Sequence, residues 1–592
     1  MLKESVLSHI ELLVDGERYR EALENIERLR KKKLDKGKHL RIGVLESRCL
    51  EGLGEFIEAF KVAQSVYEKA KGHREQKVTA IEALLEMAAA GWKLGQPDDV
   101  LQACTEAERI REELKKDGVP SVESIKADIL YHESLGWYLR NETHKAIDCV
   151  RKSLSIREAL NDRLNVIKAY MRLGYVSIEI DMSQALKYQE TALELNRELN
   201  HKDSIILALL CKGLVRANEG RKDEAERLLK QSKQMIDEYD IRRRTLESLF
   251  NLAFLYYSKG DFLVAAEYYK ECLSLSERVG AKLFITFCSI NLGEIHRARG
   301  DLDEALKCNK RAMELSQEMG RSWSYDVALA NCGLIEHAKG NLEEALRLLQ
   351  ESQSSAEERE DGSWIAARSK LFRALYVVIV LTDLGKIEKA RERVEMLRPI
   401  VEDRTEEVAH QLYKIAAAIV LKGTPLSRNR TLAREYLTEV VDGRPVNIEV
   451  STLAHLLLCD LLVEDLGLSG DKRALDELKR RLASLVDTSV DQGSASLQAE
   501  ALLLQSKVAL LELDTKEADR LMTQAHLHAN EKGLQIMADR IANEHKNLLS
   551  ELGFWEALKS ESPTLTEQTE RVRINEHLGR MLQQGVWRKM LF

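Results

Sequence analysis

The sequence predicts an all-α protein, an α-α superhelix built as a solenoid of about 13 helical hairpins. Three observations support this fold class. The composition combines 44% hydrophobic and 31% charged residues with only 6 Pro in 592 residues, which favours helix interiors. A short turn pattern recurs along most of the chain, and the Ala within it returns at a constant interval. Because one hairpin cannot bury its own apolar face, such hairpins must stack into a continuous core.

The turn pattern consists of Gly, a polar residue, two or three spacers, Glu or Lys, and Ala. It occurs as GERYREA (16–22), GEFIEA (54–59), GRKDEA (220–225), GDFLVAA (260–266), GDLDEA (300–305), GNLEEA (340–345) and GKIEKA (385–390). A Gly after an apolar periodic segment favours the left-handed end of a helix. The Asp or Asn that follows suits the start of the next helix. The pattern therefore predicts the junction between the two helices of a hairpin.

The period of the array is read from the marker Ala residues. Steps of 40 residues separate Ala185, Ala225, Ala265, Ala305 and Ala345. Small residues occupy one position twelve residues before a marker, namely Gly213, Ala253, Gly293 and Gly333. Small side chains let helix axes approach closely, so we expect the two helices of each hairpin to pack tightly there.

The repeat resembles the tetratricopeptide repeat (TPR). The matching residues of one unit are Leu252, Ala253, Tyr256, Gly260, Asp261, Ala265, Tyr269 and Cys272. The period is near 40 instead of 34 and the usual closing Pro is missing, which is similar to the long-helix repeats of kinesin light chains and bacterial peptide-sensing regulators. A period near 40 also fits HEAT or armadillo arrays, but the turn pattern favours the TPR. The resemblance covers most of residues 1–550.

Four segments are expected along the chain. Residues 1–422 should hold units 1–10, and residues 448–553 should hold degenerate C-terminal units. Between them, residues 423–447 carry two of the six Pro and a weak repeat signal, which predicts an irregular linker or a change of superhelical pitch. Residues 554–592 do not fit the repeat and form a separate tail.

The tail contains its own helix signals. Thr564 and Glu567 have the spacing of a capping box. One apolar stripe follows, comprising Ile574, Leu578, Met581 and Leu582, and Gly585 can end the helix before Trp587 and Phe592. This apolar segment needs a surface to cover it. It could cap the open end of the solenoid, occupy the groove of its own chain, or join a second copy by self-association.

The predicted partner-binding surface follows from the resemblance, which implies that the first helix of each hairpin lines the concave face. Asn251, Asn291 and Asn331 lie 14 residues before their marker Ala, so they have equal helical phase. An Asn amide both donates and accepts hydrogen bonds, which suits the backbone of an extended peptide. In the resembling families, Asn at this position contacts bound peptide. Alternatively, these amides only tie one hairpin to the next.

Further candidates lie near the same face. Lys168, Arg172, Arg297 and His337 would favour an acidic segment or a C-terminal carboxylate, unless they are ordinary solvated charges. Phe254 and Tyr257 could form apolar pockets, or they could pack between helices.

Several functional classes are disfavoured. The sequence contains no phosphate-binding loop, no dinucleotide fingerprint, no H-E-x-x-H and no G-x-S-x-G, so we expect no enzyme and no cofactor or metal site. The net charge of −8 disfavours binding to nucleic acid. Nine Cys are scattered without a C-x-x-C pair and no apolar run approaches the ~20 residues of a membrane span, which together favour a cytoplasmic protein.

The predicted function is a protein–protein interaction scaffold or adaptor that binds a peptide or partner protein in its concave groove. The alternative is a sensor or regulatory solenoid of a signalling or transcription assembly, controlled by its C-terminal tail. An RNA-binding solenoid is a third class, which the acidity and the few groove aromatics disfavour.

Overall fold

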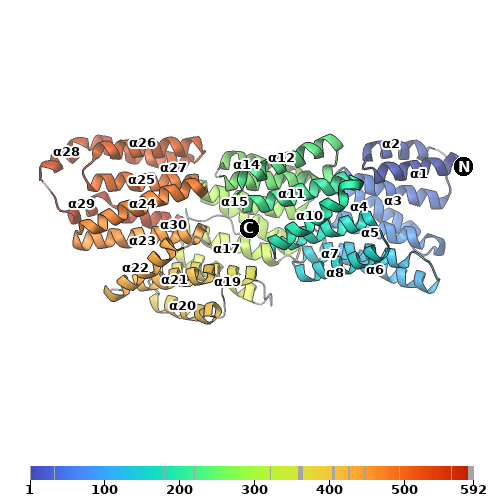
Figure 1. Cartoon of the computed structure of the whole chain (residues 1–592), viewed down its shortest axis with the longest axis horizontal. Coiled ribbons are helices and arrows are strands. Elements are labelled where there is room, and N and C mark those ends of the chain that lie inside the picture. Colours follow the sequence, from blue (N-terminus) through green and yellow to red (C-terminus); the bar gives the residue numbers. More distant parts are fainter. Residues whose placement is uncertain are drawn as a thin grey trace. The chain divides into compact units, whose positions relative to one another are not determined.

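The computed structural model describes residues 2–31, 34–178, 180–218, 221–259, 261–320, 322–357, 364–402, 407–424, 427–443, 448–492, 494–561 and 563–584. These ranges contain 30 α-helices and two short 3-10 helices, and no strand lies within them (Figure 1). The predicted all-α superhelix of TPR-like hairpins is therefore confirmed.

The helices follow one another as pairs. The first six pairs are α1 (Leu2–Asp15) with α2 (Tyr19–Arg30), α3 (Lys36–Gly52) with α4 (Phe56–Ala70), α5 (Lys77–Leu94) with α6 (Pro97–Lys116), α7 (Val122–Leu139) with α8 (Thr143–Ala159), α9 (Arg163–Ser177) with α10 (Met182–Leu199), and α11 (Lys202–Asn218) with α12 (Lys222–Tyr239). The next four are α13 (Thr245–Ser258) with α14 (Phe262–Val279), α15 (Lys282–Arg299) with α16 (Leu302–Glu318), α17 (Ser322–Ala338) with α18 (Leu342–Glu357), and α19 (Trp364–Asp383) with α20 (Ile387–Glu402).

Three further pairs complete the array. They are α21 (Glu407–Lys422) with α22 (Ser427–Asp442), α23 (Ile448–Ser469) with α24 (Lys472–Gln492), and α25 (Ala495–Leu511) with α26 (Thr515–Glu531). The chain then continues through α27 (Gln535–Ser550), α28 (Leu552–Glu561), α29 (Leu565–Val572) and α30 (Ile574–Gln584). The 3-10 turns η1 (Arg74–Gln76) and η2 (Arg242–Arg244) precede α5 and α13.

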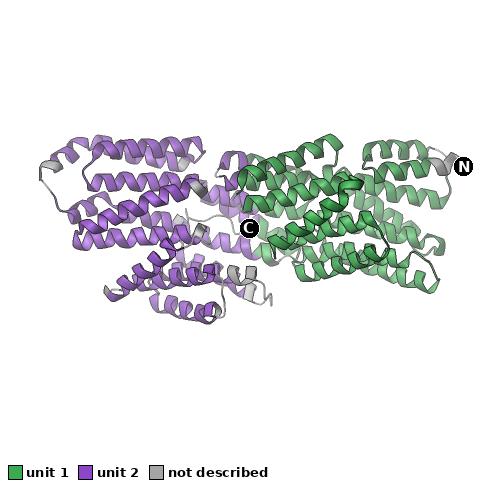
Figure 2. Ribbon diagram, in the orientation of Figure 1, with its two compact units in different colours: residues 1–255, 267–289, 312–325 green, residues 256–266, 290–311, 326–592 purple. Residues whose placement is uncertain are grey.

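The chain divides into two compact units (Figure 2). Unit 1 comprises residues 1–255, 267–289 and 312–325, and unit 2 comprises residues 256–266, 290–311 and 326–592. Within unit 1, successive first helices contact one another, as α1 does α3, α3 does α5, and α5 does α7. The same holds in unit 2 for α19, α21 and α23. Neighbouring first helices thus lie side by side along these stretches of each unit, and we call the surface that the first helices present the inner face.

The marker Ala residues lie where the helices of a hairpin meet. Ala225, Ala305 and Ala345 are fully buried. A Cβ added to Gly293 would lie 3.2 Å from the carbonyl oxygen of Ala305, and one added to Gly333 would lie 3.2 Å from that of Ala345. Larger side chains would therefore force the helices apart, which explains the small residues of the repeat.

The expected irregular segment 423–447 is largely helical, because it contains α22. Ala433, Leu437 and Val440 provide a helical apolar stripe that is fully buried, and α22 packs against α21 and α23. The two Pro of this segment, at positions 425 and 445, lie outside the described residues. The segment is a hairpin partner, and α21 belongs to the eleventh pair.

The tail differs from its prediction in one respect. The capping box at Thr564 and Glu567 is present, with the Thr564 hydroxyl accepting from the backbone N–H of Glu567. The expected single helix is two helices, because Arg573 adopts a left-handed conformation with φ of 53°. The predicted end at Gly585, together with Trp587 and Phe592, lies outside the described residues.

The tail packs on the inner face of unit 2. Helices α29 and α30 contact the first helices α23 and α25, and Ile574, Leu578 and Met581 are fully buried there. Apolar residues surround both α23 and α25, so each helix needs cover on two sides. The tail therefore covers first helices of its own chain, and the buried stripe gives no support to self-association.

All nine Cys are free, and eight of them are buried. No helix in the described ranges combines the length and apolar character needed to cross a membrane.

Candidate functional site

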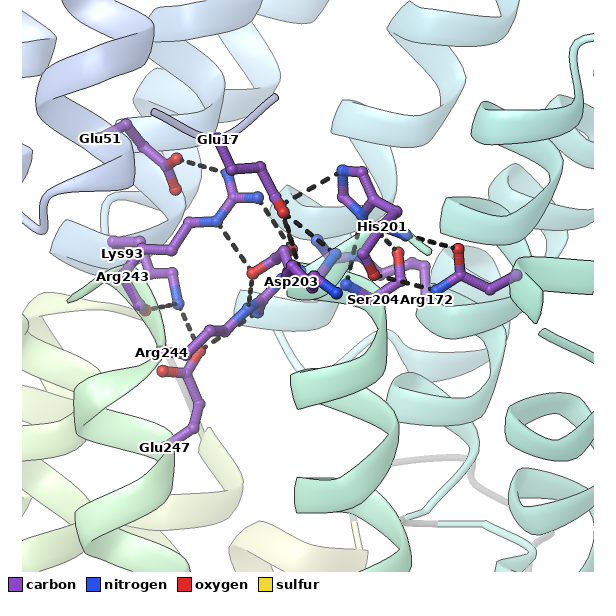
Figure 3. A network of polar contacts seen from close by, with 12 residues as sticks. Glu17, Glu51, Lys93, Arg172, His201, Asp203, Ser204, Arg243, Arg244 and Glu247 are labelled. Atoms are coloured by element: carbon purple, nitrogen blue, oxygen red, sulfur yellow. Dashed lines mark hydrogen bonds and ion pairs between the residues drawn. The ribbon is translucent and has the colours of Figure 1, made fainter. Parts of the chain in front are cut away.

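A network of buried charges connects distant hairpins of unit 1 (Figure 3). It joins the turn after α1 and the C-terminal ends of α3 and α5 to the N-terminal ends of α11 and α13 and the residues that precede them. We call it the clasp and define it by Glu17, Glu51, Lys93, His201, Asp203, Arg243, Arg244 and Glu247. These contacts connect the first three hairpins of unit 1 to hairpins that follow more than 100 residues later.

Glu17 caps the start of α11. It lies in the turn between α1 and α2, where its φ of 60° directs the backbone out of the first helix. Its carboxylate accepts from the backbone N–H groups of Lys202 at 3.0 Å and Asp203 at 3.1 Å. The first N–H groups of a helix have no partner within the helix, and a carboxylate there also interacts favourably with the helix dipole.

His201 completes this cap as a neutral imidazole. The backbone N–H of Ser204 donates to its Nδ1 at 3.3 Å, so the ring proton resides on Nε2, which lies 3.3 Å from Glu17 Oε1. Burial, followed by the charge of Lys168, lowers the pKa of His201 to about 4.

Asp203 and Glu247 balance the cations of the clasp. Asp203 accepts from Arg244 Nε at 2.7 Å and lies 2.8 Å from Arg243 Nη2. Although burial opposes ionisation, these two guanidinium groups hold the pKa of Asp203 well below its usual range. Glu247 forms a buried ion pair with Lys93, whose Nζ also donates to the carbonyl of Arg243 at 3.2 Å.

A second group of polar side chains adjoins the clasp on α7 and α9. We call it the cationic patch and define it by Tyr131, His132, Lys168 and Arg172, all of which are half-buried on the inner face. Lys168 makes no hydrogen bond or ion pair with any residue that the structure describes. The buried Nδ1 of His132 and Nε of Arg172 also have no hydrogen-bond partner.

Aromatic rings support Arg172. Its guanidinium lies 5.2 Å from the ring centre of Tyr131 and 5.5 Å from that of Trp92, and Nη2 is 3.4 Å from the Tyr131 hydroxyl. Such contacts stabilise a cation without neutralising it. The aromatic faces therefore position the guanidinium and leave its charge uncompensated.

Neighbouring cations shift the pKa values of the patch residues. Burial, followed by Arg172 and Arg48, lowers the pKa of His132 to about 3. Burial, followed by Arg243, lowers the pKa of Lys168. Burial should raise the pKa of Tyr131, but the charges of Arg172 and Lys168 lower it. Cations dominate the surroundings of all three groups, so the patch is suited to an anion.

The three predicted Asn residues are buried, with exposed fractions of 8% for Asn251, 0% for Asn291 and 3% for Asn331. Asn251 Nδ2 donates to the carbonyl of Leu210 on the preceding first helix at 3.3 Å, and Asn331 Nδ2 donates to Asn309 Oδ1 at 3.3 Å. These contacts correspond to the alternative in which the amides tie helices together. Their role in partner binding stays a prediction.

The two predicted aromatic residues also lie in the interior. Phe254 and Tyr257 are buried, and the Tyr257 ring centre is 5.3 Å from that of Phe262. This is packing between helices, so neither ring forms an open pocket.

Arg297 and His337 are likewise buried. Arg297 pairs with Glu294 at 3.1 Å, and His337 Nε2 lies 2.6 Å from Asp383. The His337 carbonyl accepts from Gln583 of the tail at 3.1 Å. Neither residue is a solvated charge, and of the predicted set only Lys168 and Arg172 are half-exposed.

No sequence motif predicted the clasp. The one local signal was the run Arg242–Arg244 between two predicted helices, since three consecutive cations in a short turn need acidic partners. The partners Glu17, Glu51 and Asp203 come from other turns, and their proximity depends on the superhelical pitch.

Consecutive helical hairpins, contacts between successive first helices and the recurring small residues at the hairpin junctions define the class of the protein as a TPR solenoid. The family described as the MalT-like TPR region matches residues 176–533, more than half of the chain, and the chain belongs to this family. The comparison with curated proteins found no match.

Three solved structures show a low similarity to this chain. A Rap protein complexed with Competence and Sporulation Factor has 14% identity and a TM-score of 0.43, covering 62% of this chain and 98% of that chain. The apo quorum sensor NprR from B. thuringiensis has 14% identity and a TM-score of 0.38, covering 60% and 98%. Aspartyl phosphate phosphatase F from Bacillus subtilis has 13% identity and a TM-score of 0.35, covering 60% and 93%.

Proposed function

We propose that this chain is a protein-interaction scaffold or adaptor that binds an extended peptide, or such a segment of a partner protein, on the inner face of unit 1. The half-buried cationic patch on α7 and α9 carries this proposal, because it presents charged and aromatic groups that the chain itself does not neutralise. Buried polar groups are normally paired, so unpaired groups on an inner face favour a ligand.

The tail already covers first helices on the inner face of unit 2, which favours unit 1 as the unit that binds the ligand. Around α23 and α25, the tail helices α29 and α30 already cover the first helices. His577 of α30 is buried with its Nε2 2.9 Å from the carboxylate of Glu500 on α25, so the contact is polar as well as apolar. A ligand would have to displace this packing, whereas the cationic patch of unit 1 has no such cover among the described residues.

We place the protein in the cytoplasm and assign it no catalytic role. Free, buried Cys residues suit a reducing compartment. The charged groups of the clasp bind one another, and groups engaged in this way are not poised to act on a substrate.

The tail favours a second candidate function, a regulatory solenoid of a signalling or transcription assembly. Its contact with the inner face of unit 2 is one that a partner could replace. In this case a partner would bind unit 2 and release α29 and α30.

Hydrogen-exchange mass spectrometry separates these functions. The full chain is mixed with a pool of random heptapeptides, and exchange is compared with that of the free chain. The scaffold proposal expects slower exchange in α5, α7 and α9, with α6 and α8 unchanged. Faster exchange in α29 and α30 instead would favour the regulatory solenoid, and no change in any first helix would contradict both.

A further inference from the structure

The tail helices α29 and α30 lie on unit 2 as a pair of short helices. They have 8 and 11 residues, and helices of this length are marginal in water by themselves. The surface beneath them therefore stabilises their structure. A Cβ added to Gly467 of α23 would lie 3.7 Å from Thr569 of α29, and Gln583 of α30 donates to the carbonyl of His337 on α17 at 3.1 Å. The contact has the form of a helical ligand on a receptor surface, with both parts in one chain.

The surface beneath α30 carries two carboxylates, and α30 meets each with a basic residue type. Glu500 of α25 is fully buried, and its Oε2 lies 2.9 Å from Nε2 of His577. Oε1 of Glu544 on α27 lies 3.6 Å from Nη1 of Arg580. A spacing of three residues places His577 and Arg580 on one side of α30. The acidic surface thus complements the side of the helix that faces it.

The match between Glu500 and the tail is incomplete. Arg540 forms an ion pair with Oε1 of Glu500, but neither Oε2 of Glu500 nor Nε2 of His577 has a hydrogen-bond partner among the described residues. Their 2.9 Å contact is therefore not aligned as a hydrogen bond. Burial also lowers the pKa of His577, so the imidazole is uncharged at neutral pH. A Lys or Arg in its place would supply both a hydrogen bond and a compensating charge.

We propose that the inner face formed by α23 and α25 binds a basic amphipathic helix of a partner protein, and that α30 holds this site until such a helix displaces it. The partner helix carries apolar side chains at the spacing of Ile574, Leu578 and Met581. It carries Lys or Arg at the place of His577, where Glu500 selects it by charge. The inference rests on the regulatory function proposed above and adds the chemistry of the partner.

The test measures the binding of two labelled peptides to the full chain by fluorescence anisotropy at pH 7.5. Both peptides have the sequence of residues 563–584. The basic peptide carries His577→Lys, and the acidic peptide carries His577→Glu and Arg580→Glu. The attached tail competes at an effective concentration on the order of 1 mM, so the wild-type chain should bind the basic peptide weakly. Leu578→Ala in the chain removes a fully buried tail contact and should raise this affinity about tenfold or more.

Matched variants separate the roles of apolar contact and charge. Leu527→Ala is the control for Leu578→Ala, because Leu527 is 54% exposed on α26, and it should leave the affinity unchanged. The Leu578→Ala chain should bind the acidic peptide about tenfold more weakly than the basic one. Adding Glu500→Gln should reduce this difference, and adding Glu544→Gln, at a half-buried position, should do so as well. Circular dichroism checks that each chain is folded, and Glu544→Gln keeps the test decisive if Glu500→Gln unfolds.

The outcomes have distinct meanings. Equal affinity of the wild type and Leu578→Ala for the basic peptide would overturn a displaceable tail. Equal binding of the two peptides by Leu578→Ala would overturn the selection of a basic helix. A dimer of Leu578→Ala in light scattering would identify the tail of a second copy as the occupant and contradict a partner helix.

This test and the tests of the proposed function can fail separately. The heptapeptide experiment reads α5, α7 and α9 of unit 1, so failure of helix binding on unit 2 leaves the scaffold function intact. Release of α29 and α30 in that experiment, without binding of the basic peptide by Leu578→Ala, would keep the regulatory function and overturn the basic helix as its partner.

Discussion

Acidification should destabilise unit 1 through two histidines that are neutral in the folded chain. The pKa is about 4 for His201 and about 3 for His132, compared with 6.5 for an ordinary histidine. Because folding lowers both pKa values, the unfolded chain binds more protons at mildly acidic pH. The free energy of unfolding is therefore unaffected by these two histidines above pH ~6.5. It decreases as the pH falls from ~6.5 toward the pKa values of the two histidines in the folded chain.

The magnitude follows from the pKa difference. A pH of 5 is about 1.5 units below the pKa of a histidine in the unfolded chain, so that histidine is mostly protonated. The same histidine in the folded chain remains essentially uncharged at this pH. At about 1.4 kcal/mol per unit, each histidine costs roughly 2 kcal/mol of unfolding free energy relative to pH 7.5, and the two together cost about 4 kcal/mol. Buried carboxylates with a raised pKa, such as Glu17 and Glu86, act in the opposite direction, so variants must isolate the effect of each histidine.

Urea unfolding at pH 7.5, 6.0 and 5.0, followed by hydrogen exchange of α7 and α11, measures the loss in the relevant segments. His201→Gln and His132→Gln should each remove about 2 kcal/mol of the difference between pH 7.5 and pH 5. His9→Gln, at an exposed position on α1, is the matched control. Parallel pH profiles for the wild type and both variants would refute the assignment of neutral, buried imidazoles to these positions.

Four further perturbations test the clasp, the tail and the asparagines. Lys93→Met should cost about 3–5 kcal/mol in urea unfolding, because it leaves the buried Glu247 without its partner, and Lys93→Met with Glu247→Leu should recover most of this loss. Leu578→Ala removes a fully buried side chain and should cost about 2–5 kcal/mol, measured by thermal unfolding of unit 2; a loss below 0.5 kcal/mol would indicate that the tail does not pack as described. Deleting residues 563–592 should expose the apolar surface of α23 and α25 and cause association in light scattering, whereas a well-behaved monomer would contradict a structural role for the tail. Asn331→Ala should lower unfolding free energy by about 1 kcal/mol if its amide ties α17 to α16; unchanged stability with weaker peptide binding would instead support the predicted ligand contact.

The repeat itself was predictable because its signals are local. A marker such as Ala305 and a small residue such as Gly293 are twelve positions apart, and a single hairpin brings them together. The capping box at Thr564 was predictable for the same reason, since its hydrogen bonds span three residues. The clasp depends instead on how far each hairpin is rotated relative to the last, and no short segment of sequence encodes that rotation.

Equal helical phase did not distinguish exposed from buried positions. Asn251, Asn291 and Asn331 occupy equivalent places on successive first helices, as their spacing predicted. A first helix contacts its neighbours over much of its circumference, so a shared position can lie between helices as readily as on a surface. Lys168 and Arg172 were predicted from residue type, and the structure places both in half-buried positions on the inner face.

The cap that Glu17 provides for α11 bears on how unit 1 folds. In an ideal repeat array each repeat depends only on its immediate neighbours, and terminal repeats can be removed one at a time with additive loss. Here a residue of the first hairpin satisfies the start of a helix 185 residues later, so truncating that hairpin should weaken the middle of the array as well. Such long-range closure raises contact order, which predicts slow and cooperative folding for this unit.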